Sequence, residues 1–479
     1  FNGRTILNQG VVNWSAGYLR SGNGGAFVNA AGGVFNDFNA PGYAIQNPSF
    51  NGSAGTFSFT NNGAYVRNVG GTTYFQAPFT NTGTLNLQQG DIRLEAGGSM
   101  NAGSVVNVSA GAHLYFANDY AIQTGASFAG PGLVNQIAGT LTLNGTLTAQ
   151  SFLWSGGNWN AANNSGLTST IGVGTTLNLA NSHDELRDFN GRTILNQGVV
   201  NWSSGYLRSG NGGAFVNAAG GVFNDLNSPG YSVNRSGYGG VFTFTNRGAY
   251  NKTTGGTTTF DIPFANDGGT VLVTAGSLVF QDQFTQTNNG TLRLVNGATA
   301  TFSQGLALPA ASMLTGTGTL TGNITTAGRV APGSSPGTLT IAGNLTLQGS
   351  SQLIIELGGL GPGGDYDVLA VTGTATLAGG LALTFVNGFG ATVNAGNTFT
   401  FLTSSGLSGV FANAPTNGAR LGTTDGLGSF QVNYGVNNVS LSNFVPVPEP
   451  STWALLLTGL GAVALVARRR TRESARERS

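Results

Sequence analysis

Residues 189–231 read FNGRTILNQGVVNWSSGYLRSGNGGAFVNAAGGVFNDLNSPGY, and this stretch decides the fold. It is built of short runs in which polar and apolar side chains alternate, and glycine and asparagine separate the runs. Alternation with a period of two predicts strands that bury one face. Residues 1–43 repeat the stretch with three substitutions, at Ala16, Phe38 and Ala40. Because Phe1 corresponds to Phe189 in mid-chain, we expect that the sequence is N-terminally incomplete and that more repeats and a signal peptide precede it.

A shorter period lies within each copy. Asparagine corners recur mostly every 20–22 residues, at Asn8, Asn29, Asn61, Asn81, Asn196, Asn217, Asn246, Asn266 and Asn288. One short strand run per corner predicts an all-β fold, a right-handed parallel β-helix, because a single rung cannot bury its inward side chains and stacked rungs can. Glycines at the corners supply positive φ, and the asparagines tolerate left-handed backbone and can stack as amide ladders.

The sequence divides into four parts. We expect one solenoid module at 1–187, a second at 188–327, a β-rich cap at 328–443 and a sorting tail at 444–479. The third part opens with APGSSPGTLTI at 331–341 and contains YDVLAV at 366–371. It resembles the segment that closes the passenger region of autotransporter and filamentous-haemagglutinin-like adhesins, which implies a cap on the solenoid and an adhesin-like role.

Composition limits the function classes. Charged residues are only 8% of the chain and hydrophobic residues 40%, which is the reverse of a disordered composition. Before residue 444 there are 13 basic and 15 acidic side chains, so no electrostatic footprint for nucleic acid exists. Cysteine is absent, which removes disulfides, thiolate metal sites and cysteine nucleophiles.

The tail differs from everything before it. Pro448, Glu449 and Pro450 precede an almost uninterrupted apolar run from Trp453 to Ala467. The two prolines hold the glutamate on a stiff segment that is incompatible with a helix. We expect a C-terminal transmembrane helix that contains Trp453, Leu455, Leu456, Leu457, Leu460, Val463, Leu465 and Val466, with a basic stop at Arg468, Arg469 and Arg470. The apolar run spans only about 22 Å, so such an anchor is marginal against a hydrocarbon core of about 30 Å.

In order and spacing, these three features resemble the PEP-CTERM sorting signal. The resemblance implies recognition of Pro448, Glu449 and Pro450 by an exosortase, a membrane-embedded processing enzyme of exopolysaccharide-producing Gram-negative bacteria. It also implies export across the inner membrane, transient anchoring by the C-terminus, and a final place on the cell surface or in the extracellular matrix. The same tail is sometimes labelled an ice-binding protein C-terminal domain, a label that by itself says nothing about ice.

Chemistry-bearing residues are sparse. His183-Asp184-Glu185 is the one sequence-adjacent cluster of histidine and carboxylates, but adjacent residues of a strand point to opposite faces. His113 is expected as an ordinary strand residue, Lys252 is the only lysine, and Asp365 with Asp367 only faintly resembles a calcium-binding turn. We therefore predict no enzyme, catalytic residue, metal or cofactor. Carboxylates that meet across rungs leave open a β-helical polysaccharide lyase or hydrolase, which a cluster of Asp, Glu and Arg in a groove would favour.

Two surface features complete the functional hypothesis. Trp14, Tyr18, Trp202 and Tyr206 are expected to contact extracellular polysaccharide, which makes the chain an exported structural or adhesin-like surface protein. Thr-x-Thr pairs, as at 319–321 and 338–340, suggest ice binding as a further alternative. Their sequence spacing does not follow the rung period, so we do not expect a regular threonine array.

Overall fold

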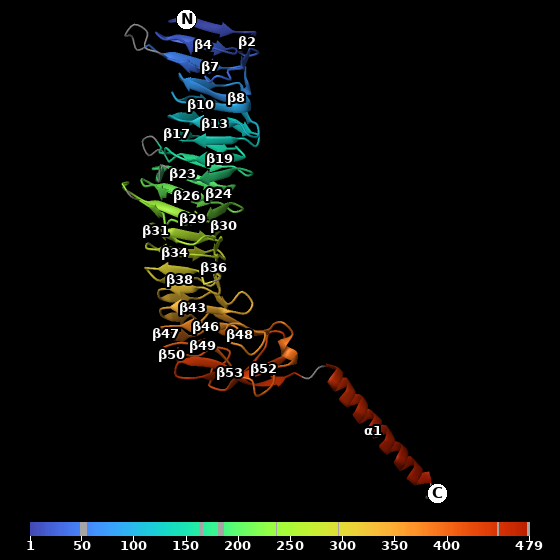
Figure 1. Cartoon of the computed structure of the whole chain (residues 1–479). Coiled ribbons are helices and arrows are strands. Elements are labelled where there is room, and N and C mark those ends of the chain that lie inside the picture. Colours follow the sequence, from blue (N-terminus) through green and yellow to red (C-terminus); the bar gives the residue numbers. More distant parts are fainter. Residues whose placement is uncertain are drawn as a thin grey trace.

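The computed structural model describes residues 1–47, 55–161, 166–180, 186–235, 237–295, 297–447 and 450–476. Over these residues the chain forms a tall column of short strands followed by one helix (Figure 1). Along the column each strand pairs in parallel with strands one rung away, as β24 does with β21 and β27. This confirms the prediction of an all-β, parallel β-solenoid.

Three faces run along the column. In the N-terminal part the first face contains β1 (Thr5–Asn8), β4 (Gly25–Asn29), β7 (Phe57–Asn61), β9 (Phe79–Asn81), β11 (Gly98–Met100), β14 (Tyr120–Ile122) and β17 (Leu141–Leu143). The second contains β2 (Val11–Trp14), β5 (Val34–Asp37), the first halves of β8 (Ala64–Gln76) and β10 (Thr84–Leu94), β12 (Val105–Val108) and β15 (Ser127–Ala129). The third contains β3 (Leu19–Arg20), β6 (Ala44–Gln46), the second halves of β8 and β10, β13 (His113–Phe116), β16 (Leu133–Gln136) and β19 (Ser151–Trp154).

The faces continue below these strands. Strand β19 is followed by β21 (Thr176–Leu179), β24 (Val199–Trp202), β27 (Val222–Asp225), β30 (Ala249–Lys252), β33 (Thr270–Val273), β36 (Thr291–Leu294), β39 (Met313–Gly316), β42 (Arg329–Pro332), β45 (Gln352–Leu357) and β48 (Gly380–Phe385). Another face contains β18 (Gly145–Leu147), β20 (Thr168–Ile171), β23 (Thr193–Asn196), β26 (Gly213–Asn217), β29 (Phe242–Asn246), β32 (Phe264–Asp267) and β35 (Phe284–Thr287), and then β38 (Leu306–Leu308), β41 (Ile324–Thr326), β44 (Leu345–Leu347), β47 (Thr374–Leu377) and β50 (Gly406–Gly409). The last contains β22 (Leu186–Asp188), β25 (Tyr206–Arg208), β28 (Ser232–Asn234), β31 (Thr257–Phe260), β34 (Ser277–Phe280), β37 (Thr299–Phe302), β40 (Thr319–Thr321), β43 (Thr338–Ala342), β46 (Val368–Val371) and β49 (Phe399–Thr403).

The two sequence copies do not occupy the same face. Strand β24 repeats the sequence of β2, but it stacks below β19 and β21 on the face that β3 begins. The second copy is therefore rotated by one face relative to the first. Surfaces that are identical in sequence consequently point in different directions.

The interior follows from the strand alternation. In β24, Val200 and Trp202 are buried and their neighbours are not. Rings at the same strand position stack between rungs, and Phe215 and Phe244 lie 5.0 Å apart with planes 5° from parallel. The same column continues through Phe264 to Phe284, with centroids 5.0 and 5.5 Å apart. Such stacks add to area burial and fix the register of successive rungs.

Asparagine ladders line the buried corners, as the sequence predicted. Asn8 donates to Asn29, Asn29 to Asn61, and Asn61 to Asn81, each at 2.7 Å between Nδ2 and Oδ1. A second ladder joins Asn196, Asn217, Asn246, Asn266 and Gln286. One predicted member is wrong, because Asn288 turns the chain with φ of 50° and Gln286 takes the ladder position. The ladder asparagines lie at or next to the ends of strands and do not adopt left-handed backbone.

Parallel pairing ends in a different arrangement. Strand β49 pairs antiparallel with β53 (Asn438–Pro446), which pairs antiparallel with β52 (Gly428–Tyr434), and β51 (Ala419–Gly422) closes that sheet. A 3-10 turn at Phe389–Ala391 packs nearby through Phe389, whose ring centroid is 5.9 Å from that of Phe399. This β-rich end covers the last parallel rungs and shields their unpaired edges.

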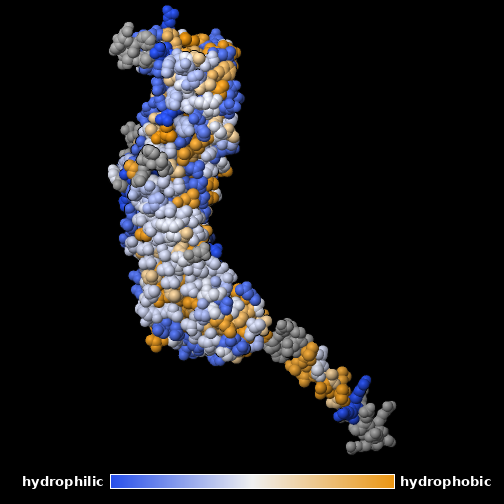
Figure 2. Space-filling view, viewed as in Figure 1, coloured by the Kyte–Doolittle hydropathy of each residue, from blue (hydrophilic) through white to orange (hydrophobic). Residues whose placement is uncertain are grey.

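The tail forms helix α1 (Pro450–Arg476), which projects away from the column (Figures 1 and 2). Its apolar side chains are exposed, from 53% for Leu456 to 77% for Leu455. No helix among the described residues is long and apolar enough to cross a membrane. The expected transmembrane helix is therefore not confirmed, and its fifteen apolar residues reach only about 22 Å.

Candidate functional site

A patch of ionisable and aromatic side chains lies on the outer face of β8, β10 and β13. It is called the Arg93 patch below and consists of Thr72, Tyr74, Gln76, Asp91, Arg93, Glu95, His113 and Tyr115. Alternate residues of β10 place Asp91 and Arg93 outward, while Ile92 and Leu94 fill the core. In a chain with only 8% charged residues, such a concentration on one sheet face is unusual.

The register of the three strands determines which side chains of the patch are neighbours. Arg93 lies between Tyr74 and Tyr115 on the adjoining strands, and Asp91 lies between Thr72 and His113. Neighbouring strands are about 4.8 Å apart, so the arginine is flanked by one ring on each side.

Ion pairs and hydrogen bonds hold these side chains in place. His113 Nδ1 lies 2.8 Å from Asp91 Oδ1, and Arg93 Nε donates to Glu95 Oε1 at 2.7 Å. Gln76 donates to the other oxygen of Glu95 at 3.1 Å. The charged groups remain between 26% and 41% exposed, so a ligand can reach them.

The electrostatics of the patch are mild. The pKa of Tyr115 is raised, first by desolvation and then by the carboxylate of Asp91, with Arg93 opposing. Tyr115 therefore stays a neutral phenol at neutral pH. Two phenol rings, two carboxylates and a guanidinium can pack on sugar rings and hydrogen-bond their hydroxyls.

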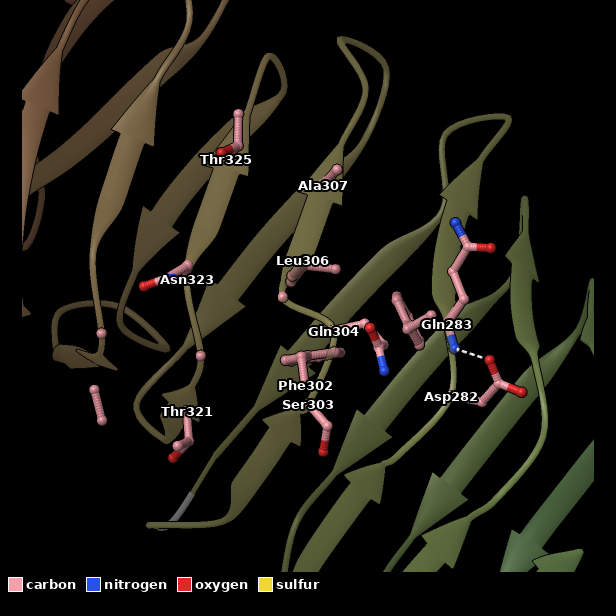
Figure 3. A pocket seen from close by; sticks show the side chains of 15 residues that line it. Asp282, Gln283, Phe302, Ser303, Gln304, Leu306, Ala307, Thr321, Asn323 and Thr325 are labelled. Atoms are coloured by element: carbon pink, nitrogen blue, oxygen red, sulfur yellow. Dashed lines mark hydrogen bonds between the residues drawn. The ribbon is translucent and has the colours of Figure 1, made fainter.

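A separate hollow of about 1080 Å³ lies where the face of β34, β37, β40 and β43 turns into that of β35, β38, β41 and β44. Figure 3 shows amide and hydroxyl side chains around it, including Gln283, Gln304 and Asn323. Asp282 is its one ionisable lining residue, and it accepts a hydrogen bond from the backbone N–H of Gln283 at 2.7 Å. Its lining therefore consists mainly of uncharged groups, several of which can donate and accept hydrogen bonds.

Beside the hollow runs a two-column hydroxyl array, called the threonine array below. It comprises the outward pairs Thr257/Thr259, Ser277/Val279, Thr299/Thr301, Thr319/Thr321 and Thr340/Ala342 of β31, β34, β37, β40 and β43, stacked in direct register. Eight of these ten side chains carry a hydroxyl. The expectation that threonines form no regular array is therefore wrong on this face.

Several residues singled out from the sequence lie elsewhere. Trp14 and Trp202 are buried, and their indole N–H groups donate to Gly17 and Gly205 carbonyls, so neither can contact an external ligand. Tyr18, by contrast, is 55% exposed.

Tyr18 and Tyr206 each pair with a half-buried tyrosine of the next rung. Tyr18 packs edge-on against Tyr43, and Tyr206 against Tyr231, with 5.0 Å between ring centroids in both pairs. These two pairs are the accessible part of the aromatic surface that the sequence suggested.

The remaining candidates gather no ligand set. His183, Asp184 and Glu185 lie outside the described residues. Asp365 and Asp367 face backbone N–H groups, those of Gly361 for Asp365 and of Gly337 and Glu356 for Asp367. The described residues contain no group of three or more His, Cys, Asp or Glu side chains that could hold a metal ion.

In the tail, Pro448 and Glu449 lie outside the described residues, and Pro450 opens α1. Arg468, Arg469 and Arg470 are exposed directly after the apolar run. Residues 446–470 match the family model for the PEP-CTERM protein-sorting motif. The tail is a sorting signal. A PEP-CTERM motif supports an exported protein that is sorted to the cell surface, as the sequence predicted.

No curated protein matches the sequence. Among solved structures, the chain is similar to the crystal structure of the Haemophilus influenzae Hap adhesin, with 11% identity and a TM-score of 0.28. That match covers 92% of this chain and 64% of the adhesin chain, so this chain spans less than two thirds of the adhesin's length.

Sequence reasoning missed the Arg93 patch. The outward series Asp91, Arg93 and Glu95 is visible in the sequence, and His113 follows one rung later. The trio of Asp, Glu and Arg that would favour an enzyme is present, but it lies on the outer face of a parallel sheet.

Proposed function

We propose that this chain is an exported, non-enzymatic surface protein whose solenoid binds extracellular polysaccharide through the Arg93 patch. The observation that carries the proposal is the arrangement of Arg93 between Tyr74 and Tyr115, with carboxylates on both sides. Flat rings and charge-assisted hydrogen bonds together match the apolar faces and hydroxyl edges of sugars.

The test compares two arginine variants of the full chain on immobilised acidic and neutral polysaccharides. Arg93→Ala removes the centre of the patch, and Arg247→Ala removes an arginine that is 53% exposed and paired with Asp267 elsewhere on the solenoid. We expect at least tenfold weaker retention for Arg93→Ala, about 1.4 kcal/mol, and unchanged retention for Arg247→Ala. Equal retention of both variants and the parent chain would exclude the patch as the binding surface.

The same samples distinguish binding from catalysis. A β-helical lyase or hydrolase would use the carboxylates of Asp91 and Glu95 and would release new chain ends from the polysaccharide. Our proposal expects stable retention without such release. Chain ends that appear with the parent protein and disappear in Asp91→Asn would support the enzyme and refute a purely binding role.

We further propose that an exosortase recognises Pro448, Glu449 and Pro450 and that the apolar run of α1 holds the protein at the membrane until processing. The support is the matched motif together with the exposed leucines and the arginines that follow them. Glu449→Ala should leave the solenoid folded and block release in an exosortase-bearing host, while Glu473→Ala, beyond the motif, should not. Unchanged release of Glu449→Ala would contradict this assignment.

The threonine array favours ice as a second candidate ligand. Its hydroxyls repeat about every 4.8 Å along the column and about 6.6 Å across each strand, a regular grid that can order water. Thr301→Tyr in the grid should abolish any thermal hysteresis, and Thr325→Tyr on β41 should not. Absence of hysteresis in the parent chain would remove this candidate.

A further inference from the structure

The only lysine of the chain is buried deep in the solenoid beside an aspartate. Lys252 on β30 and Asp225 on β27 are direct neighbours in the strand register, and both side chains are 0% exposed. The distance between Lys252 Nζ and Asp225 Oδ1 is 3.4 Å. Such a position is unusual for a lysine, because the desolvation of two buried charges costs free energy even when they are paired.

The first module contains a buried ion pair at the corresponding position. There Arg67 faces Asp37, and its guanidinium donates to five acceptors, among them Asp37 and the carbonyls of Gly70 and Gly71. Lys252 donates to only two, Asp225 and the carbonyl of Asn227. The second module thus has, in place of a guanidinium with five hydrogen-bond acceptors, a primary amine with two.

The carboxyl group is held for attack. Tyr250 donates its hydroxyl to Asp225 Oδ2 at 2.7 Å, and Asn227 donates its backbone N–H to Oδ1 at 3.0 Å. The carbonyl of Asn227 accepts from Lys252 at 2.8 Å and so fixes the nitrogen beside the same carboxyl. Tyr250 itself is fully buried among phenylalanines, with the ring centroid of Phe223 at 5.3 Å.

We propose that Lys252 and Asp225 condense into an intramolecular isopeptide bond that cross-links two adjacent rungs. This inference does not rest on polysaccharide binding. It assigns a covalent modification site to the second module, and the first module carries a non-reactive counterpart.

The step balances with groups that are present. A proton passes from the Lys252 ammonium to the Asp225 carboxylate, which leaves a neutral amine and a neutral acid. Nζ then attacks Cγ, Oδ2 takes up the negative charge while Tyr250 donates to it, and Oδ1 leaves as water with the second proton of the nitrogen. The products are one amide and one water, so no oxidant or other reactant is needed.

Two physical features favour the reaction. Enclosure between neighbouring strands gives the amine a high effective concentration at the carboxyl carbon. Desolvation also raises the pKa of Asp225, which favours the proton transfer that precedes attack, although Lys252 and the hydrogen bonds to the carboxyl oppose that shift.

The test is the intact mass of the full chain. After purification, the folded fraction that resists protease is denatured and weighed, and then digested with trypsin. We expect a mass lower than that of the sequence by one water, and one branched peptide in which residues 209–235 are joined to residues 248–293, because trypsin does not cleave after an acylated lysine. An unchanged mass together with separate peptides 209–235 and 248–252 would overturn the proposal.

Two variants act as controls. Lys252→Arg restores the cation of the first copy, so it should fold and show the unmodified mass. Asp225→Asn presents an amide to the same amine, so it should lose ammonia in place of water. A water loss that persists in Lys252→Arg would locate the modification elsewhere and would also overturn the proposal.

Discussion

Asn217 lies in the middle of the second amide ladder, and its replacement by alanine isolates the energy of that ladder. Its side chain accepts from Asn196 at 2.8 Å and donates to Asn246 at 2.8 Å and to the Ala249 carbonyl at 3.0 Å. All three ladder side chains are 0% exposed. Bulk water therefore cannot reach the hydrogen-bonding groups that the lost amide leaves behind.

The magnitude follows from the groups left behind. Asn217→Ala removes three hydrogen bonds and leaves Asn246 Oδ1 without its amide donor, while Asn196 keeps a bond to the Val222 carbonyl. At about 1 kcal/mol for each bond and about 1–3 kcal/mol for the unsatisfied buried oxygen, the loss is about 4–6 kcal/mol.

The same rung supplies a matched control. Asn224 also belongs to an amide ladder, with bonds to Asn201 at 2.9 Å and Asn251 at 3.1 Å, but it lies on the outer face of β27 and is half-buried. Solvent can satisfy the partners that Asn224→Ala exposes. We expect a loss below about 1 kcal/mol for this variant.

Native-state hydrogen exchange is the suitable assay, because rungs of a solenoid unfold locally and global transitions are not two-state. Protection of the amides in β23, β26 and β29 should fall by at least a hundredfold in Asn217→Ala, and by less than tenfold in Asn224→Ala. Equal effects in the two variants would refute the reasoning, since they would show that burial of the ladder contributes nothing beyond the bonds themselves.

Two further predictions concern a glycine and a buried acid. Gly248→Ala should destabilise its rungs by several kcal/mol, because a Cβ there would lie 2.1 Å from the Gly221 carbonyl oxygen, whereas Gly255→Ala meets nothing within 4 Å and should change thermal stability little. Desolvation raises the pKa of Asp367 to about 7, so between about pH 4 and pH 7 the folded state binds a proton that the unfolded state has released. Stability should therefore fall as pH rises through this window, by up to about 4 kcal/mol, and a melting-temperature profile of Asp367→Asn should be flat there. A parent profile that rises from pH 4 to pH 7 would contradict this assignment.

Much of the fold is readable from the sequence because each level of the pattern has one physical meaning. Alternation gives the buried parity of a strand, and the asparagine period gives the rung length. That period gives the ladder steps from Asn8 to Asn29 and from Asn61 to Asn81, whereas the step from Asn29 to Asn61 is longer, at 32 residues. The burial of Trp202 is also predictable from the sequence. Trp202 lies two residues after the buried Val200, so both side chains point to the same face of the strand.

The surface sites are harder to predict because they depend on register, which rung insertions change. His113 meets Asp91 only because 22 residues separate them, and the preceding step, from Thr72 to Asp91, takes 19. A shift of one residue would turn an outward side chain into the core. Composition and sequence spacing therefore show which functional groups the chain contains, but they do not show which of these side chains lie next to one another.

The threonine array shows the same dependence on register, because residues with unequal sequence spacing are aligned in it. Thr299 and Thr319 are 20 residues apart, and Thr319 and Thr340 are 21 apart, yet all three stack in one column. A fixed sequence period misses such a column, because a corner absorbs the extra residue while the strands stay aligned. What keeps them aligned is the interior: Phe280 and Phe302 stack 5.2 Å apart beneath the array, and a slip of either strand would expose a ring. The regularity of the outer face is thus imposed by the core, so the surface chemistry of this solenoid has to be read through the register of its buried side chains.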